Sequence, residues 1–271
     1  MNELARMHYR GFNYSAMRLI ETSAKSGYIW IGKGIRLFRK NPIHLLSIFF
    51  TYLFSMTLVI HMPVVGSMLW IILMPGLFVG FMSACRDVLA NRHICPLALF
   101  TGFRAYGAGV AWRLLKLGLI YYLLVSISLF LTSMIDDSWP LKTFMSEVKS
   151  YDNIVYRNVS LSSIILRFVI YIPTNMLFWF APMLTAWHSM PPVKAMFFSF
   201  VACWRNRVAF LVYLAAWFAV IMGVSLVLAF ILNTFSVLNI ALTLLLPGGA
   251  ILWTVIYCSL HISYCGCFSC E

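Results

Sequence analysis

One histidine and three cysteines lie within ten residues near the end of the chain, and side chains of these types bind zinc. Four such ligands could complete a tetrahedral site, but the C-x-C-x-x-C spacing of the cysteines is not a common structural-zinc pattern. We therefore predict that residues 261–271 form a frayed cytoplasmic tail with incidental or acylated thiols, without a bound metal or other cofactor. The weak metal candidates are His261, Cys265, Cys267 and Cys270.

A second candidate is Arg167, the one charged residue clearly inside an apolar stretch. A long basic side chain near the end of a span can reach outward to the head groups at little cost, and we favour this interpretation. The alternative is contact with an anion or a lipid phosphate, helped by the polar Asn175 and by a helix break at Pro173. Arg167 and Asn175 are therefore the candidates for a ligand or lipid-phosphate site.

Motifs for enzymatic chemistry are missing from the sequence. It contains no G-x-S-x-G, no H-E-x-x-H and no phosphate-binding loop, so we predict no catalytic residues and no enzymatic activity. The apolar stretches also hold no acidic residue, whereas proton- and cation-coupled transporters usually place a carboxylate near the middle of the membrane. This absence disfavours ion-coupled transport.

The elements that must position these residues are membrane helices. Hydrophobic residues make up 62% of the 271 positions and charged residues only 10%, too few to give a soluble protein a polar surface. A bilayer core needs about 20 apolar residues per helix, whereas the strands of a barrel would alternate polar and apolar residues. We predict an all-α polytopic membrane domain over residues 27–260. Its six predicted spans lie near residues 43–62, 64–85, 114–135, 161–186, 208–232 and 240–260.

The basic residues predict the orientation of these spans. Sixteen of the 20 Lys and Arg residues precede the first span or lie around the second-to-third and fourth-to-fifth connections; the opposite side has Lys142, Lys149 and Arg157. By the positive-inside rule both termini are cytoplasmic, and residues 1–26 form an N-terminal arm. We attribute the net charge of +12 to contact with anionic lipid head groups, not to nucleic acid binding.

Residues 28–40 have the periodicity of an amphipathic helix. Apolar side chains such as Trp30 and Leu37 cover one half of this helix, and basic side chains cover the other. We predict that it lies on the inner leaflet; the alternative is packing on the cytoplasmic loops. Gly32 and Gly34 weaken the helix by about 1 kcal/mol each, so contact with lipid must stabilise it. The predicted lipid-surface residues are Lys33, Arg36, Arg39 and Lys40.

A surface segment followed by two spans recurs along the chain. Residues 97–113 and 195–207 precede the third and fifth spans in the way that residues 28–40 precede the first. We therefore predict three tandem hairpins with interfacial helices on the cytoplasmic face. Each return span carries a proline in its cytoplasmic half, and a kinked helix needs neighbours that satisfy the freed carbonyl, so the return helices should line the interior. These prolines are Pro75, Pro182 and Pro247.

Several short motifs follow one another along the chain: Trp30-Ile31, Asn41-Pro42, Pro63-Val64-Val65-Gly66, Pro75-Gly76, Cys85-Arg86, Leu99-Phe100-Thr101-Gly102-Phe103, Phe180-Ala181-Pro182 and Arg205-Asn206. In this order they resemble an uncharacterised family of multi-pass inner-membrane proteins found in proteobacteria. The resemblance covers about residues 27–260 and implies a location in a bacterial inner membrane. Family members tend to close with a Tyr-Arg-Asp type ending, whereas this chain has Leu260-His261-Ile262. The family has no established activity, so no site residue is carried over.

Two functions are compatible with these features. The first is a non-enzymatic component that organises lipid or a membrane protein complex, favoured by a basic, aromatic inner face and an interior poor in ionisable groups. Its partners would be membrane lipids, with anionic head groups on the cytoplasmic side, and possibly a membrane protein. The second is a permease for a small neutral or anionic solute, built on the kinked return helices. A closed, side-chain-filled bundle favours the first, and a water-lined cavity reaching Arg167 or Asn175 favours the second.

Overall fold

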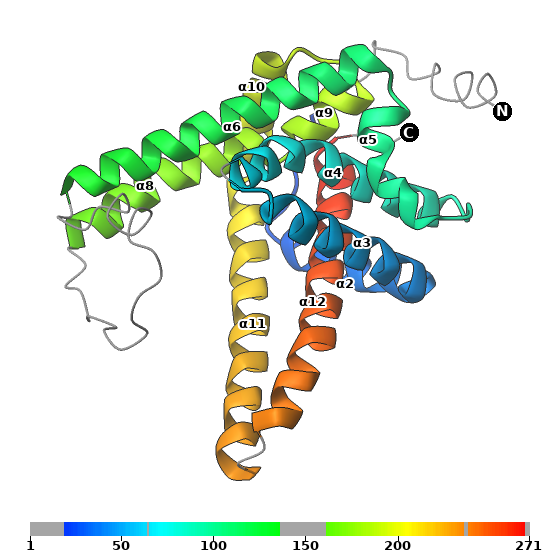
Figure 1. Cartoon of the computed structure of the whole chain (residues 1–271), viewed down its shortest axis with the longest axis vertical. Helices are drawn as coiled ribbons and strands as arrows, with labels where there is room; N and C mark the ends of the chain where they lie inside the picture. Colours follow the sequence, from blue (N-terminus) through cyan, green and yellow to red (C-terminus); the bar gives the residue numbers. More distant parts are fainter. Residues whose placement is uncertain (1–18, 64, 136–160, 236–237, 269–271) are drawn as a thin grey trace.

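In the computed structural model, long helices are joined by short helical segments (Figure 1), and the structure describes residues 19–63, 65–135, 161–235 and 238–268. Within these residues six helices are long and apolar enough to cross a membrane, so the predicted all-α polytopic fold is confirmed. The helices are α2 (Ser26–Lys40), α3 (Pro42–Ile60), α4 (Gly66–Leu89), η1 (Pro96–Phe100), α5 (Thr101–Arg104), α6 (Ala108–Ile135), α8 (Leu161–Phe178), α9 (Ala181–Trp187), α10 (Pro192–Arg205), α11 (Arg207–Phe235) and α12 (Leu238–Cys267).

The fourth apolar stretch is interrupted at a different place from the one predicted. The predicted break at Pro173 is wrong, because α8 continues through this residue to Phe178. The interruption comes at residues 179–180, and α9 then begins with Pro182 in its first turn, where a missing N–H costs no helical hydrogen bond. The Phe180 N–H lies at the interruption and donates instead to Ser199 Oγ at 2.9 Å. The side chain of Ser199 in α10 therefore provides the hydrogen-bond acceptor for this backbone N–H at the interruption.

The long helices extend from a common region in different directions. Helices α6 and α8 run to one side of this region, while α11 and α12 form a separate arm (Figure 1). Helix α4 packs against both α3 and α6, and 61% of its apolar window is buried. By contrast, the windows of α3 and α6 are each 17% buried and that of α11 is 11% buried. The described parts of these helices therefore do not form a single closed six-helix bundle.

The prolines of the return helices differ in their surroundings. Pro75 in α4 and Pro182 in α9 are buried, as expected for helices that line an interior. Pro247 in α12 is exposed, so the prediction that all three lie inside is wrong there. The reason is that the buried residues among the described side chains of α12 begin at Ala250, whereas Pro247 lies nearer the start of this helix.

Helix α2 is packed between α11 and α12. The Trp30 ring lies 5.4 Å from the Phe210 ring and 6.0 Å from the Tyr213 ring of α11. On the other side, a Cβ at Gly34 would lie 2.7 Å from the Ser259 backbone of α12, so glycine is what permits this approach. The amphipathic helix therefore buries its apolar face, including Trp30 and Leu37, mainly against protein, and contact with lipid is not needed to cover these side chains.

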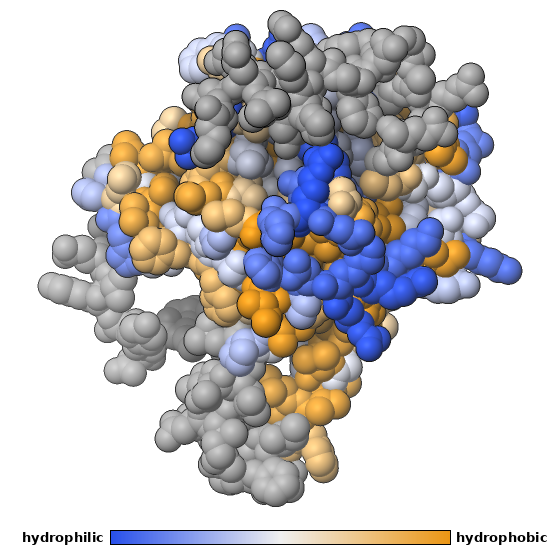
Figure 2. Space-filling model, turned by 90° about the vertical axis from the view of Figure 1, so that its right-hand side faces the viewer, coloured by the Kyte–Doolittle hydropathy of each residue, from blue (hydrophilic) through white to orange (hydrophobic). Residues whose placement is uncertain are grey.

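The basic half of α2 faces outward. Lys33, Arg36, Arg39 and Lys40 are all exposed, as the periodicity predicts. On the side where α2 and α3 lie in Figure 1, hydrophilic residues gather in one cluster with hydrophobic surface around and below it (Figure 2). Contact of these four residues with lipid remains a prediction.

The other two surface segments pack in a comparable way. Segment η1 contacts both α3 and α4, and a Cβ at Gly80 of α4 would overlap the Leu99 carbonyl of η1. Helix α10 contacts α8 and α9, and Ser199 Oγ donates to the Met176 carbonyl of α8 at 2.8 Å. Each surface segment thus packs on two other helices: η1 packs on α3 and α4, and α10 on α8 and α9, which precede them in the chain, whereas α2 packs on the distant α11 and α12. We call the region where all of them meet the junction.

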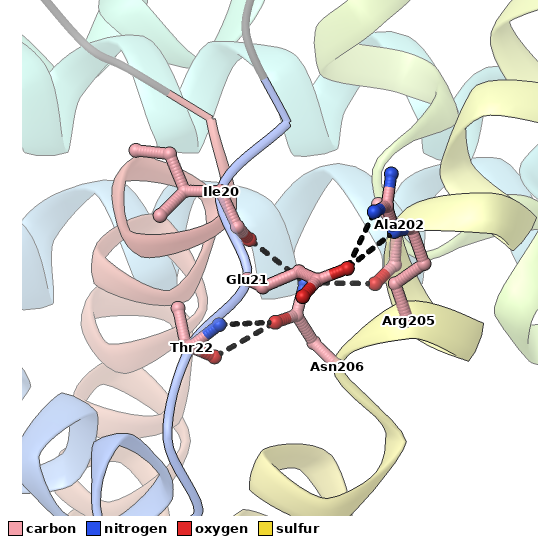
Figure 3. A network of polar contacts seen from close by, with 6 residues as sticks. All are labelled: Ile20, Glu21, Thr22, Ala202, Arg205 and Asn206. Atoms are coloured by element: carbon pink, nitrogen blue, oxygen red, sulfur yellow. Dashed lines mark hydrogen bonds and ion pairs between the residues drawn. The ribbon is translucent and has the colours of Figure 1, made fainter.

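A strap formed by residues 19–22 joins the two ends of the described chain at the junction. An antiparallel bridge links Leu19 to Phe268, and the Ile20 N–H donates to the Cys267 carbonyl at 2.9 Å. Asn206, which is 2% exposed between α10 and α11, fastens the strap through both ends of its side-chain amide (Figure 3). Its Oδ1 accepts from the N–H and Oγ1 of Thr22, and its Nδ2 donates to the carbonyls of Ile20 and Ala202.

Candidate functional site: the polar centre of the junction

Arg86 lies at the centre of the junction, near the end of α4. Its guanidinium carbon is 5.1 Å from the centre of the Trp187 ring, a distance typical of a cation–π contact. The same group donates to the Tyr106 hydroxyl at 3.3 Å, and that hydroxyl lies 3.1 Å from the buried Ser83 Oγ. One basic side chain therefore connects α4, the segment before α6, and α9.

Helix α12 supplies the other wall of this site. The Tyr264 ring packs edge-on against Trp187 at 5.0 Å, and the Tyr264 hydroxyl lies 2.9 Å from His188 Nε2. His261, one turn earlier, is 1% exposed and also packs edge-on against Trp187, with 5.9 Å between the ring centres. The return segments α4, α9 and α12 thus converge on one aromatic core around Trp187.

The C-terminal residues form part of this core, so the prediction of a frayed tail is wrong. Helix α12 continues to Cys267, and Tyr264, Cys267 and Phe268 are each at most 2% exposed. The Phe180 ring lies 5.7 Å from Tyr264 and 5.5 Å from Phe268. A ring from a distant part of the chain therefore packs against these residues, which would contact solvent in an isolated tail.

The weak metal candidates do not come together as one site. The Cys265 Sγ lies 3.8 Å from His261 Nε2, and Cys270 is outside the described residues. Within residues 19–63, 65–135, 161–235 and 238–268, no group of three or more His, Cys, Asp or Glu side chains is placed to hold a metal ion. A different thiol pair meets in the junction, where Cys85 and Cys258 are fully buried with their sulfur atoms 4.0 Å apart.

The candidates for a ligand or lipid-phosphate site both belong to α8. Asn175 donates from Nδ2 to the Tyr171 carbonyl of its own helix at 2.8 Å. Arg167 belongs to α8, but its side chain is outside the described residues, as are Lys142, Lys149, Arg157 and residues 1–18. The structure therefore gives no contact between Arg167 and Asn175.

The sequence interpretation did not identify the residues that organise the junction. There Arg86 contributes only to the predicted orientation and to the Cys85-Arg86 motif, and Asn206 only to the Arg205-Asn206 motif. The available signal was the pair of dipeptides Cys85-Arg86 and Arg205-Asn206 within the family resemblance. Both dipeptides place a polar residue at a helix end where several elements meet. In chemical terms the site holds one guanidinium among aromatic rings and neutral hydroxyls, an arrangement suited to fastening helices together.

His188 gives the junction a pH dependence. Burial lowers the pKa of its imidazole below the usual range, because the charged form loses its hydration. The unfolded chain, with a histidine pKa of about 6.5, then binds this proton more readily than the folded protein does. The contribution of His188 to stability is therefore fully present above that pH and is lost as the pH falls toward the lower folded pKa.

We expect His188→Gln to reduce the loss of stability on acidification, because glutamine can keep a hydrogen bond to Tyr264 without acquiring a charge. The measurement is the detergent-denaturation midpoint of parent and variant between pH 8 and pH 5. His93→Gln, a change in an exposed loop, is the matched control and should follow the parent. Identical slopes for parent and His188→Gln would show that His188 does not sense pH in this range.

Comparison with known proteins gives an independent view of the chain. Over 256 residues, which cover 93% of this chain and 94% of the relative, it is 43% identical to a probable inner membrane protein of Burkholderia thailandensis. No family model and no solved structure matches the chain. The similarity and the six apolar helices together place the protein in the inner membrane as a multi-pass protein. The chain belongs to the same family as this inner membrane protein, in agreement with the resemblance of its short motifs.

Proposed function

We propose that this protein has no catalytic activity and organises lipid in the inner membrane. The carrying observation is the contrast between a packed junction and arms with largely uncovered apolar surfaces. Only 11% of the apolar window of α11 and 17% of those of α3 and α6 are buried within the chain. Surfaces of this kind inside a bilayer must be covered by lipid chains or by another membrane protein. Spread arms therefore offer more contact with the surrounding membrane than a closed bundle would.

The junction lies on the cytoplasmic side in this proposal. The basic residues of α2, Lys33, Arg36, Arg39 and Lys40, are exposed around it, and basic residues are retained on the cytoplasmic side during insertion. Anionic phospholipids of that leaflet then lie next to these side chains, each of which contributes about 1 kcal/mol of attraction near the surface. The protein would thereby gather anionic lipid around its cytoplasmic end.

Two observations favour lipid organisation over the alternative, a permease for a small neutral or anionic solute. Asn175, one of the two residues expected to line a solute cavity, is engaged by its own helix. Most buried polar residues of the described segments, such as Ser83, Thr185 and Ser199, lie at the junction instead of along the arms. The described residues do not form the closed bundle that we expected for an organising protein, so the proposal depends on the spread arms.

A lipid-shell measurement tests this function. The full chain is reconstituted in liposomes with spin-labelled anionic or zwitterionic phospholipid, and the motionally restricted fraction of each lipid is measured. We expect the anionic lipid to be favoured about fivefold or more, the effect of a single basic residue at an anionic surface. The same liposomes should show no flux of small neutral or anionic solutes above that of protein-free vesicles. Flux without any preference between the two lipids would contradict the proposal and favour the permease.

A further inference from the structure

We infer that the outer face of α10 is an insertion surface for anionic phospholipid, with the Trp204 ring at head-group depth and the basic residues beside it on the phosphates. This inference rests on the proposed lipid-organising function and names the element that carries it. The four basic residues of α2 that the sequence suggested lie on a helix whose central apolar residues, Trp30, Ile31 and Leu37, are buried against protein.

The packing of α10 leaves one face available. Small residues, Ala195, Ser199 and Ala202, form its buried side, which lets the helix lie close against α8 and α9. Ser199 fixes this position through its hydrogen bonds to the Phe180 N–H and the Met176 carbonyl. The exposed side is therefore held in a defined orientation by the junction.

That exposed side combines aromatic and basic residues at helical spacing. Lys194, Phe197 and Trp204 fall on one stripe, and the Phe197 and Trp204 side chains are 61% and 55% exposed. Trp204 stacks on Phe200 with 6.0 Å between the ring centres and an angle of 15° between their planes. Tryptophan with one apolar and one polar edge is the side chain enriched at the membrane–water boundary.

The neighbouring cations are suited to bind phosphate. The guanidinium carbon of Arg207 is 5.6 Å from the centre of the Trp204 ring, and a planar guanidinium stacked in this way keeps its edge N–H groups for a phosphate oxygen. Lys194 Nζ lies 6.0 Å from the Phe198 ring at the other end of the stripe. Arg205 differs, because its Nε donates to Glu21 at 2.8 Å and this carboxylate offsets its charge. Lys194 and Arg207 are therefore the cations assigned to lipid.

Continuity with a lipid-facing surface favours lipid over a protein as the occupant. After the buried Asn206 the chain continues into α11, a helix long enough to cross the membrane, which carries the exposed apolar residues Val208, Leu211 and Phe218. An exposed aromatic and basic segment that leads directly into an exposed apolar helix matches the change from head groups to acyl chains. The aromatic residues of α10 then lie at the depth where α11 enters the bilayer.

Quenching of Trp204 by brominated phospholipids tests this inference in the full-length protein. For the parent and for each variant, we obtain the contribution of Trp204 by subtracting the quenching measured for the same protein carrying Trp204→Phe. Nanodiscs of rising mole fraction of brominated phosphatidylglycerol, or of brominated phosphatidylcholine, give the half-maximal point for each lipid. We expect half-maximal quenching at a lower fraction of the anionic lipid, and Arg207→Gln should raise that fraction about fivefold. Lys194→Gln with Arg207→Gln should raise it further.

The matched control is Lys33→Gln with Arg36→Gln, the same change of charge on exposed residues of α2, which should leave the Trp204 contribution unchanged. Equal half-maximal points for Arg207→Gln and the parent would overturn the inference. Absence of Trp204 quenching by either lipid would also overturn it, because a protein would then cover α10. If the spin-labelled lipid shell of the parent still prefers anionic lipid in either case, only the role of α10 fails. If that preference is missing too, the proposed function fails with it.

Discussion

Asn206→Ala is expected to lower the free energy of unfolding by about 3 kcal/mol, because the change removes four hydrogen bonds around a buried amide. The N–H of Thr22 and the carbonyl of Ile20 would lose their partner while still packed against α10 and α11. Detergent-denaturation curves of the purified variant measure the loss. The strap formed by residues 19–22 should at the same time become accessible to proteolysis.

Arg205→Gln is the control for this experiment. Arg205 is adjacent to Asn206 and forms an ion pair with Glu21, but both side chains are more than half exposed. Exposed ion pairs contribute little, so a loss of about 0.5 kcal/mol or less is expected. If Asn206→Ala and Arg205→Gln cost the same, the hydrogen bonds of Asn206 do not hold the strap to the junction.

Gly80→Ala is expected to destabilise the protein by about 3 kcal/mol, the upper part of the range for overpacking a well-packed core. The added Cβ would overlap the backbone carbonyl of Leu99, and a backbone atom cannot move aside as the end of a side chain can. Relief requires η1 to move away from α4, which would also disturb the neighbouring α3. The unfolding free energy in mixed micelles is the measurement.

Gly223→Ala provides the matched control because a Cβ added at Gly223 in α11 would meet no atom within 4 Å beyond its own neighbours and helix backbone. Alanine is the better helix former, so this change should leave stability unchanged or raise it by about 0.5 to 1 kcal/mol. Similar destabilisation by both substitutions would mean that the contact between Gly80 and Leu99 is not tight in the membrane.

The long helices could be predicted from the sequence because their signal is local. Runs such as the apolar residues of α3 and α11 are long enough to cross a bilayer core, and this can be seen without reference to any other part of the chain. Their ends were less predictable. Helix α12 was expected to stop at residue 260, but Tyr264 and Phe268 continue its buried face against Phe180. A hydropathy pattern cannot show a partner that lies so far away in the sequence.

The covering of α2 and the fastening of the strap were unpredictable for the same reason. The periodicity of residues 28–40 identifies an apolar half, but lipid and protein would cover such a face equally well. Gly34 was interpreted as a weakness of the helix, whereas the structure makes it the point of closest approach to Ser259. Asn206 binds a residue 184 positions away, a pairing that no local pattern encodes.

In the candidate site, too, some residues could be assigned from local sequence signals and others needed the fold. The basic residues of α2 could be assigned to an outer face because charge and periodicity suffice for that statement. Arg86 needed the fold, since its role follows from the Trp187 ring and the Tyr106 hydroxyl that α9 and the segment before α6 bring to it. The contact of a half-buried cation with rings from separate segments is a property of the junction as a whole.

The most direct test of this account is the distance between two arms in a membrane. Leu129 of α6 and Val227 of α11 are exposed positions in the outer parts of their helices. Spin labels at these two positions allow the distance between them to be measured by pulsed electron–electron double resonance in lipid nanodiscs. Neighbouring helices in a closed bundle lie about 8–10 Å apart, which keeps such labels within about 25 Å. Spread arms predict a distribution centred well beyond that limit. A single narrow distribution inside it would contradict the divergence on which the proposed function depends.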